Sequence, residues 1–111
     1  MQPSYAAIFR THIWDDGIRE MAERARACCA SGKFVVATDE TKGPLPVEKF
    51  EKLSHTDDFS DYGLPSFPSG RVLWWNADYP LYAARRALPN HDYYVMFEYD
   101  VYLNCLSLIH I

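Results

Sequence analysis

Apolar runs alternate along this chain with amphipathic and polar stretches, and this order predicts an α/β fold. Residues 5–13 begin with a nearly continuous apolar and β-prone run, and residues 33–38 form a second one. Such runs are typical of strands that are buried on both faces of a parallel sheet. Between them, apolar residues recur with helical spacing over 18–29, after two candidate N-cap residues, Asp15 and Asp16. This part of the chain therefore predicts a strand–helix–strand unit.

The second half of the chain predicts a long connection, another helix and a last strand. Residues 42–70 contain three of the five glycines and indicate a loop, with a short strand near 52–59. Residues 72–88 have helical spacing, in which Pro80 fits either the first turn of a helix that begins near Asp78 or a kink. Residues 93–101 are aromatic and β-branched, and we expect them to lie in the centre of the sheet, beside the first strand. The whole order predicts a mostly parallel, Rossmann-like sheet flanked by helices.

Composition narrows the class of protein. The chain has 111 residues, of which 49% are hydrophobic, which suits one domain with a packed core. Its net charge is -4, and no cluster of Lys and Arg suggests a nucleic-acid partner. No apolar run is long enough to span a bilayer, and the first residues lack the pattern of a secretion signal. Three cysteines, two of them adjacent, make a poor disulfide framework, so we expect a cytoplasmic protein.

The last six residues set the expected domain limits. Residues 106–111 (LSLIHI) resemble the in-frame translation of a transposon-end sequencing adapter. We therefore expect residues 1–105 to form part of a domain of a longer protein and residues 106–111 to be a non-native tail. The alternative is that these six residues are a native strand end.

Two carboxylates at the end of the last strand are the most informative residues. Glu98 and Asp100 are two positions apart, so on a strand their side chains point to the same face. A hydrophobic strand that ends in an acidic pair suits a hard divalent cation bound together with a phosphorylated ligand. Oxygen ligands alone favour Mg²⁺ or Mn²⁺ over zinc. We expect a metal site at Glu98 and Asp100; the alternative is a pair of solvated turn residues.

Other polar residues follow predicted strand ends or precede the second helix: Thr11, His12, Asp39, Asn76 and Asp78. Because the carboxyl ends of parallel strands share one edge, we expect Asp39, Glu98 and Asp100 to converge on one cleft. Asp39 would accept hydrogen bonds from a base or a ribose, or would serve only as a turn former. His12 and His55 are isolated, and neither predicts a catalytic triad.

Four segments, AAIFRTHIWDD, ATDE, WWNADYPLY and YYVMFEYDV, carry a family resemblance. Over about residues 5–104 the chain resembles the nucleotide-sugar-binding half of a GT-A type glycosyltransferase, as in uncharacterised bacterial proteins with EYD in place of the DXD motif. The resemblance implies that Glu98 and Asp100 hold Mn²⁺ or Mg²⁺ on the donor diphosphate. It also implies that Asp39 contacts the uridine or ribose. The base pocket would be lined by Arg10, Thr11 and His12. Glu98 stands where Asp is usual, and its extra methylene moves the carboxylate outward.

The implied activity is glycosyl transfer from a nucleotide-diphosphate sugar to a hydroxyl acceptor such as a glycan. The acceptor site and the catalytic base would lie after the last strand, so the 111-residue chain is expected to be inactive as a transferase. One alternative is a Mg²⁺-dependent nucleotidyltransferase-like enzyme. Such an enzyme would usually carry a basic, glycine-rich loop where this chain has Trp14-Asp15-Asp16. The other is a non-catalytic α/β interaction domain whose aromatic residues pack against a partner.

Overall fold

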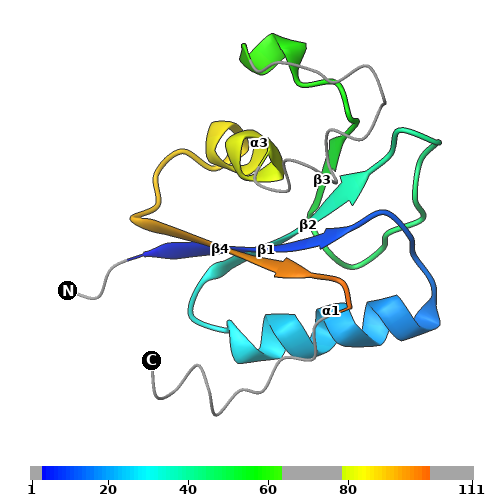
Figure 1. The fold of residues 1–111 in the computed structure, drawn as a ribbon. Helices are drawn as coiled ribbons and strands as arrows, with labels where there is room; N and C mark the ends of the chain where they lie inside the picture. Colours follow the sequence, from blue (N-terminus) through cyan, green and yellow to red (C-terminus); the bar gives the residue numbers. More distant parts are fainter. Residues whose placement is uncertain (1–3, 64–78, 101–111) are drawn as a thin grey trace.

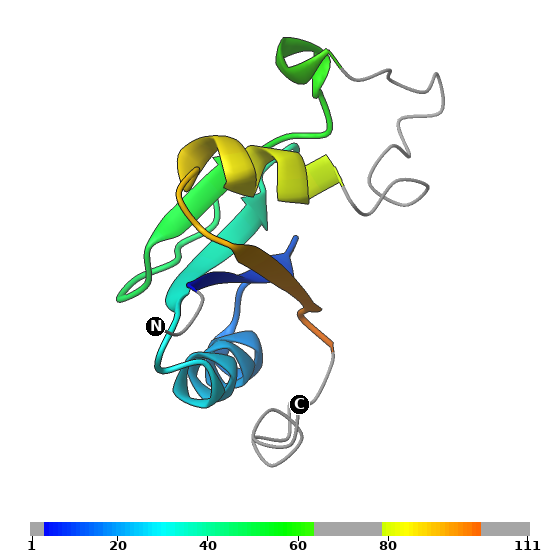
Figure 2. The same cartoon turned by 90° about the vertical axis from the view of Figure 1, so that its left-hand side faces the viewer.

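A four-stranded, all-parallel sheet with a helix on each face makes up the computed structural model, which describes residues 4–63 and 79–100 (Figures 1 and 2). The strand order is β3-β2-β1-β4. The strands are β1 (Tyr5–Thr11), β2 (Lys33–Asp39), β3 (Lys52–His55) and β4 (Tyr93–Glu98). The helices are α1 (Asp16–Cys28), α3 (Tyr79–Ala87) and the 3-10 turn η1 (Ser60–Tyr62). The predicted α/β class with a parallel, Rossmann-like sheet is confirmed.

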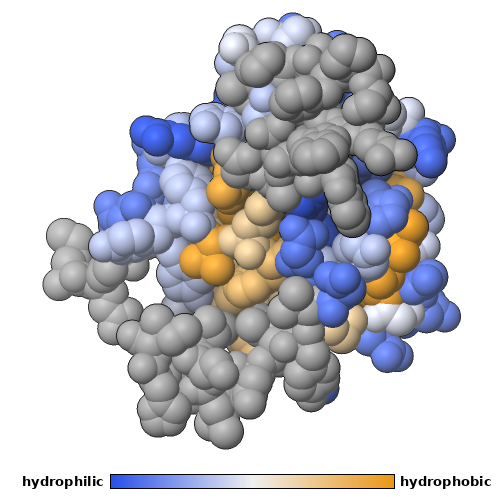
Figure 3. Space-filling view, in the orientation of Figure 1, coloured by the Kyte–Doolittle hydropathy of each residue, from blue (hydrophilic) through white to orange (hydrophobic). Residues whose placement is uncertain are grey.

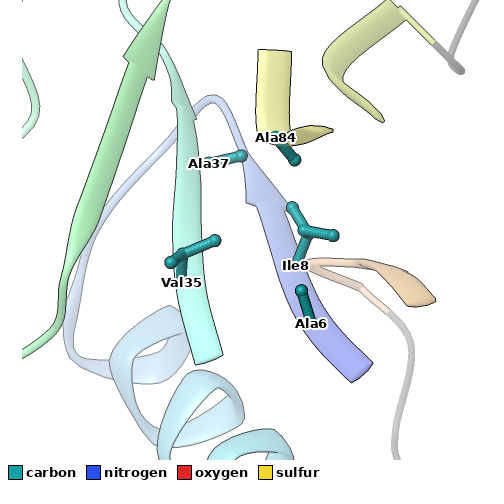
Figure 4. Close-up of a cluster of buried hydrophobic side chains, with 5 residues drawn as sticks. All are labelled: Ala6, Ile8, Val35, Ala37 and Ala84. Carbon is teal, nitrogen blue, oxygen red and sulfur yellow. The ribbon is translucent and has the colours of Figure 1, made fainter. Parts of the chain in front are cut away.

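The sheet separates two layers of apolar core. Alternate side chains of a strand point to opposite faces, so each strand supplies both layers. On one face, Ala6 and Ile8 of β1 pack with Ala84 of α3, together with apolar residues of the other strands (Figure 4). On the other face, Phe9 of β1 packs with Ala22 of α1. The face that α3 covers is called the α3 face below, and the opposite one the α1 face.

Local sequence explains where α1 begins. Oδ1 of Asp15 accepts a hydrogen bond of 2.9 Å from the backbone N–H of Ile18, which confirms Asp15 as the N-cap of α1. The helix ends at Cys28, four residues before Gly32. A Cβ at Gly32 would lie within 2.3 Å of the Tyr5 ring, so glycine allows this close approach. In α3, Pro80 is the second described residue; residues 72–78, which would distinguish a helix start near Asp78 from a kink at Pro80, lie outside the described residues.

The position of the last strand differs from the prediction. β4 pairs in parallel with β1, as expected, but within residues 4–63 and 79–100 it lies at the edge of the sheet. Tyr93 is 61% exposed and Val95 is 38% exposed. Figure 3 shows a hydrophobic patch in the part of the view where β4 lies in Figure 1. An apolar, β-branched run identifies a strand, but it does not distinguish a central strand from an edge strand when part of its apolar surface stays uncovered.

The path of the chain creates a reversal in strand order beside β1. From β1 the chain moves outward to β2 and β3, then crosses the sheet through α3 and places β4 on the other side of β1. Open α/β sheets bind ligands outside the carboxyl ends of the strands at such a switch point. Here the switch point lies between the ends of β1 and β4. Within the described part of the chain, no helix is long and apolar enough to cross a membrane.

Candidate functional site

Each strand delivers one polar residue to the α3 face at its carboxyl end. Residues two positions earlier on the four strands, Ile8, Ala37, Leu53 and Met96, all belong to the apolar cluster under α3. Because side chains alternate along a strand, Arg10, Asp39, His55 and Glu98 point to that same face. These four residues are called the edge row. The apolar core of the α3 face therefore gives way to ionisable groups at the edge where a ligand is expected.

An ion pair spans the switch point within the edge row. Arg10 and Glu98 are direct partners in the register of β1 and β4. Nη1 of Arg10 donates to Oε1 of Glu98 over 2.9 Å, and the side chains are 15% and 42% exposed. Oε2 of Glu98 accepts no hydrogen bond from the described residues. This carboxylate is therefore oriented by an internal cation, and its other oxygen is unpaired within residues 4–63 and 79–100.

Asp39 both forms a turn and offers an acceptor. Its Oδ1 atom accepts hydrogen bonds from the backbone N–H, at 3.1 Å, and from the hydroxyl of Thr41. These bonds are those of a turn former, which was one of the two predicted roles. The second oxygen, Oδ2, has no partner within residues 4–63 and 79–100. The turn therefore fixes the carboxylate and leaves one oxygen for a ligand.

His55, which is isolated from other candidate residues in the sequence, belongs to the candidate site in the structure. It ends β3 directly beside Asp39, is 8% exposed, and its ring lies 5.6 Å from that of Phe59. Nδ1 lies 3.1 Å from the backbone carbonyl of Thr56, whereas Nε2 is buried and has no partner among the described residues. Burial lowers the pKa of His55, against the opposing effects of the Thr56 carbonyl and the Asp39 carboxylate. The imidazole is therefore neutral at pH 7.

The other predicted site residues that the structure describes are Thr11, His12 and Asp100. Thr11 points to the α1 face, where its hydroxyl donates to the backbone carbonyl of Ile13 and accepts a hydrogen bond of 3.1 Å from the backbone N–H of Ile13. His12 is exposed, and its ring meets that of Tyr99 edge to face, with centroids 5.0 Å apart. Asp100 is exposed in the turn that follows β4. Asn76 and Asp78 lie outside the described residues.

The end of β4 carries two carboxylates, those of Glu98 and Asp100. Within the described part of the chain, no group of three or more His, Cys, Asp or Glu side chains could hold a metal alone. Mg²⁺ commonly uses one or two carboxylates, several waters and substrate phosphates. Oε2 of Glu98 and the exposed carboxylate of Asp100 match that requirement in number and kind. The protein residues alone would bind such an ion weakly.

A separate pocket of about 420 Å³ lies between the start of α1 and residues 46–49. Trp14, Asp15 and Arg19 line it together with residues of that loop, and none of the predicted site residues does.

The chain matches no protein-family model, no curated protein and no solved structure at a significant level.

Proposed function

We propose that this domain binds a nucleotide-diphosphate sugar at the carboxyl edge of its sheet and supplies the donor-binding part of a metal-dependent glycosyltransferase. One observation carries the proposal: the four strands place Arg10, Asp39, His55 and Glu98 on one face at the carboxyl edge of the sheet, and the first and last of them flank a topological switch point. The packing of the apolar core does not require ionisable side chains at these four positions. Its cation, carboxylates and neutral imidazole match a ligand that has both anionic and hydrogen-bonding parts.

The edge row divides naturally between the two parts of such a ligand. Arg10 and Glu98 occupy the β1–β4 side, and Asp39 and His55 occupy the β2–β3 side. A guanidinium is planar and binds phosphate oxygens in pairs, so Arg10 is the group on this face that suits the diphosphate. Asp39 then lies toward the nucleoside, where its free oxygen accepts a hydrogen bond from a hydroxyl or a base N–H.

The metal belongs to the diphosphate side of the site. Glu98, through Oε2, and Asp100 would hold Mn²⁺ or Mg²⁺ there, and the bound ion would supply positive charge beside the departing diphosphate. The guanidinium of Arg10 lies beside Glu98 and would place a second positive charge near the departing diphosphate. Transfer of the sugar to a hydroxyl needs an acceptor site, which the proposal does not assign to any described residue.

Calorimetric titration of the 111-residue chain with UDP and GDP, each with and without Mn²⁺, tests the proposal. We expect one of the two nucleotides to bind at or below millimolar concentration, and more tightly with the metal. Asp100→Asn should abolish the gain from Mn²⁺ and leave the fold intact, because the amide keeps the shape of the side chain without its charge. Glu20→Gln, an exposed position on α1, is the matched control and should behave as wild type.

Two results would overturn the assignment. One is that neither nucleotide binds at millimolar concentration, which would favour the non-catalytic interaction domain. The other is that Asp100→Asn keeps the full gain from Mn²⁺, which would remove the metal from the end of β4.

A further inference from the structure

We infer that Asp39 and His55 form a paired hydrogen-bond acceptor that binds two neighbouring donor groups on the nucleoside of the ligand. This inference rests on the proposed function and adds a residue to its site, because nothing in the sequence pattern assigns a role to His55. The two groups of the pair are Oδ2 of Asp39 and Nε2 of His55. Both lack a partner within residues 4–63 and 79–100.

The sheet holds the two residues side by side. Asp39 and His55 are direct partners in the parallel register of β2 and β3, at the last position of each strand. Neighbouring strands lie about 4.8 Å apart, and both side chains point to the α3 face. The Thr41 bonds fix the carboxylate from one side. Contact with Phe59, which itself packs on Tyr79 of α3, fixes the imidazole from the other.

The hydrogen bond at Nδ1 determines what His55 can accept. The carbonyl of Thr56 is an acceptor only, so Nδ1, 3.1 Å away, carries the proton of the neutral ring. Nε2 is then a lone-pair acceptor. This atom is buried and has no partner among the described residues, and His55 as a whole is 8% exposed. Buried acceptors are almost always paired, so an orphan beside a free carboxylate oxygen points to a missing donor.

The chemistry of the ligand follows from two adjacent acceptors. Each needs an O–H or an N–H, and a group without a donor would leave both unpaired. A nucleoside offers such donors in two places: the vicinal hydroxyls of ribose, which can fill both acceptors, and the ring N–H of a base such as uracil, which can fill one. Both sources share the donor chemistry, and nucleotide analogues separate them.

Two variants of His55 isolate its Nε2 atom. In His55→Asn, the side-chain amide can still donate to the Thr56 carbonyl, but nothing remains at the position of Nε2. In His55→Gln, the longer side chain brings an amide oxygen near that position and restores an acceptor. Thermal unfolding of both variants shows whether each one folds.

The experiment is calorimetric titration of wild type and both variants with UDP, 2′-deoxy-UDP and N3-methyl-UDP, in the presence of Mn²⁺. We expect His55→Asn to weaken UDP binding about tenfold or more and His55→Gln to recover part of the loss. Wild type should bind one analogue about tenfold more weakly than UDP, and His55→Asn should discriminate much less between them. Weaker binding of the deoxy analogue assigns a donor to ribose, and weaker binding of the methyl analogue assigns a donor to the base.

Failure of this inference is distinct from failure of the proposed function. If wild type binds UDP and a folded His55→Asn binds it equally well, the acceptor pair is wrong and the nucleotide site stands. Equal binding of UDP and both analogues by wild type also overturns the pair. If wild type binds no nucleotide, the proposed function itself fails.

Discussion

Arg10 and Glu98 meet across the place where the strand order reverses, with Nη1 and Oε1 only 2.9 Å apart. The pair joins the ends of two strands that are 88 residues apart in the sequence. It also places the cation of the edge row next to the carboxylate that we propose as a metal ligand. Structure and proposed function therefore depend on the same contact.

A double-mutant cycle measures what this contact contributes to stability. Arg10→Met and Glu98→Gln keep the approximate size of each side chain and remove its charge. Because Glu98 is 42% exposed, solvent screens the pair, and we expect a coupling of about 0.5–1 kcal/mol that decreases at high salt. Urea unfolding of wild type, both single variants and the double variant gives this value. A coupling below about 0.2 kcal/mol would show that the pair is not held in solution.

Asp39 can be tested without disturbing its turn. In Asp39→Asn, the side-chain oxygen can still accept from Thr41, but an amide donor replaces Oδ2. We expect nucleotide affinity to fall about tenfold, because two donors would then face each other. Titration of Mn²⁺ in the presence of saturating nucleotide should give an unchanged metal affinity. A variant that loses metal affinity and keeps nucleotide affinity would place Asp39 on the wrong side of the site.

The buried imidazole predicts a particular dependence of stability on pH. Since burial lowers the pKa of His55 in the folded state, the unfolded state binds the proton more readily below its ordinary value of 6.5. The free energy of unfolding should therefore decrease as the pH falls from 6.5 toward the lower pKa of the folded state. Asp39, Glu40 and Arg10 are the charged groups near the ring. In His55→Asn this decrease should be smaller, as urea unfolding between pH 7 and pH 5 would show; an identical decrease would contradict a buried, neutral His55.

Hydrogen exchange tests the position of β4. β1 is paired on both sides, whereas β4 is paired only with β1 within the described sheet. The backbone N–H groups of an edge strand that point away from its neighbour lack a ladder bond, so about half of them should exchange rapidly. We expect the amides of Ile8 and Phe9 to be the slowest to exchange, and alternate amides of β4 to exchange much faster. Uniform protection along β4 would show that another strand covers it.

The strands and helices could be predicted because each one carries its own periodicity. The run from Tyr5 and the spacing around Ala22 and Ala25 are set by local burial, and the structure confirms both elements. The place of β4 could not be read in the same way. It depends on where the crossover through α3 returns to the sheet, and no residue within the strand encodes that choice.

The candidate site was also predictable only in part, because some of its residues are identified by their own segment and one only by its pairing with another strand. Asp39 and Glu98 were found because they follow long apolar runs. His55 was missed because β3 has only four residues, Lys52–His55, too few to show a clear alternation. Its role depends on pairing with a strand 16 residues earlier in register. The short strand was predicted near 52–59, so its expected end did not fall on His55, and no pattern within these residues singles this position out.

Paramagnetic broadening by Mn²⁺ tests the central claim most directly, because it locates the site in space. Mn²⁺ is added in small amounts to the ¹⁵N-labelled chain in the presence of UDP or GDP, and the backbone amide signals are followed by NMR. We expect the signals of Glu98, Tyr99 and Asp100 to broaden first. The amides of Lys33 and Asp92, at the amino edge of the sheet, should stay sharp. Broadening that is centred on the amino edge, or that is the same with and without nucleotide, would contradict a shared metal and nucleotide site at the carboxyl edge.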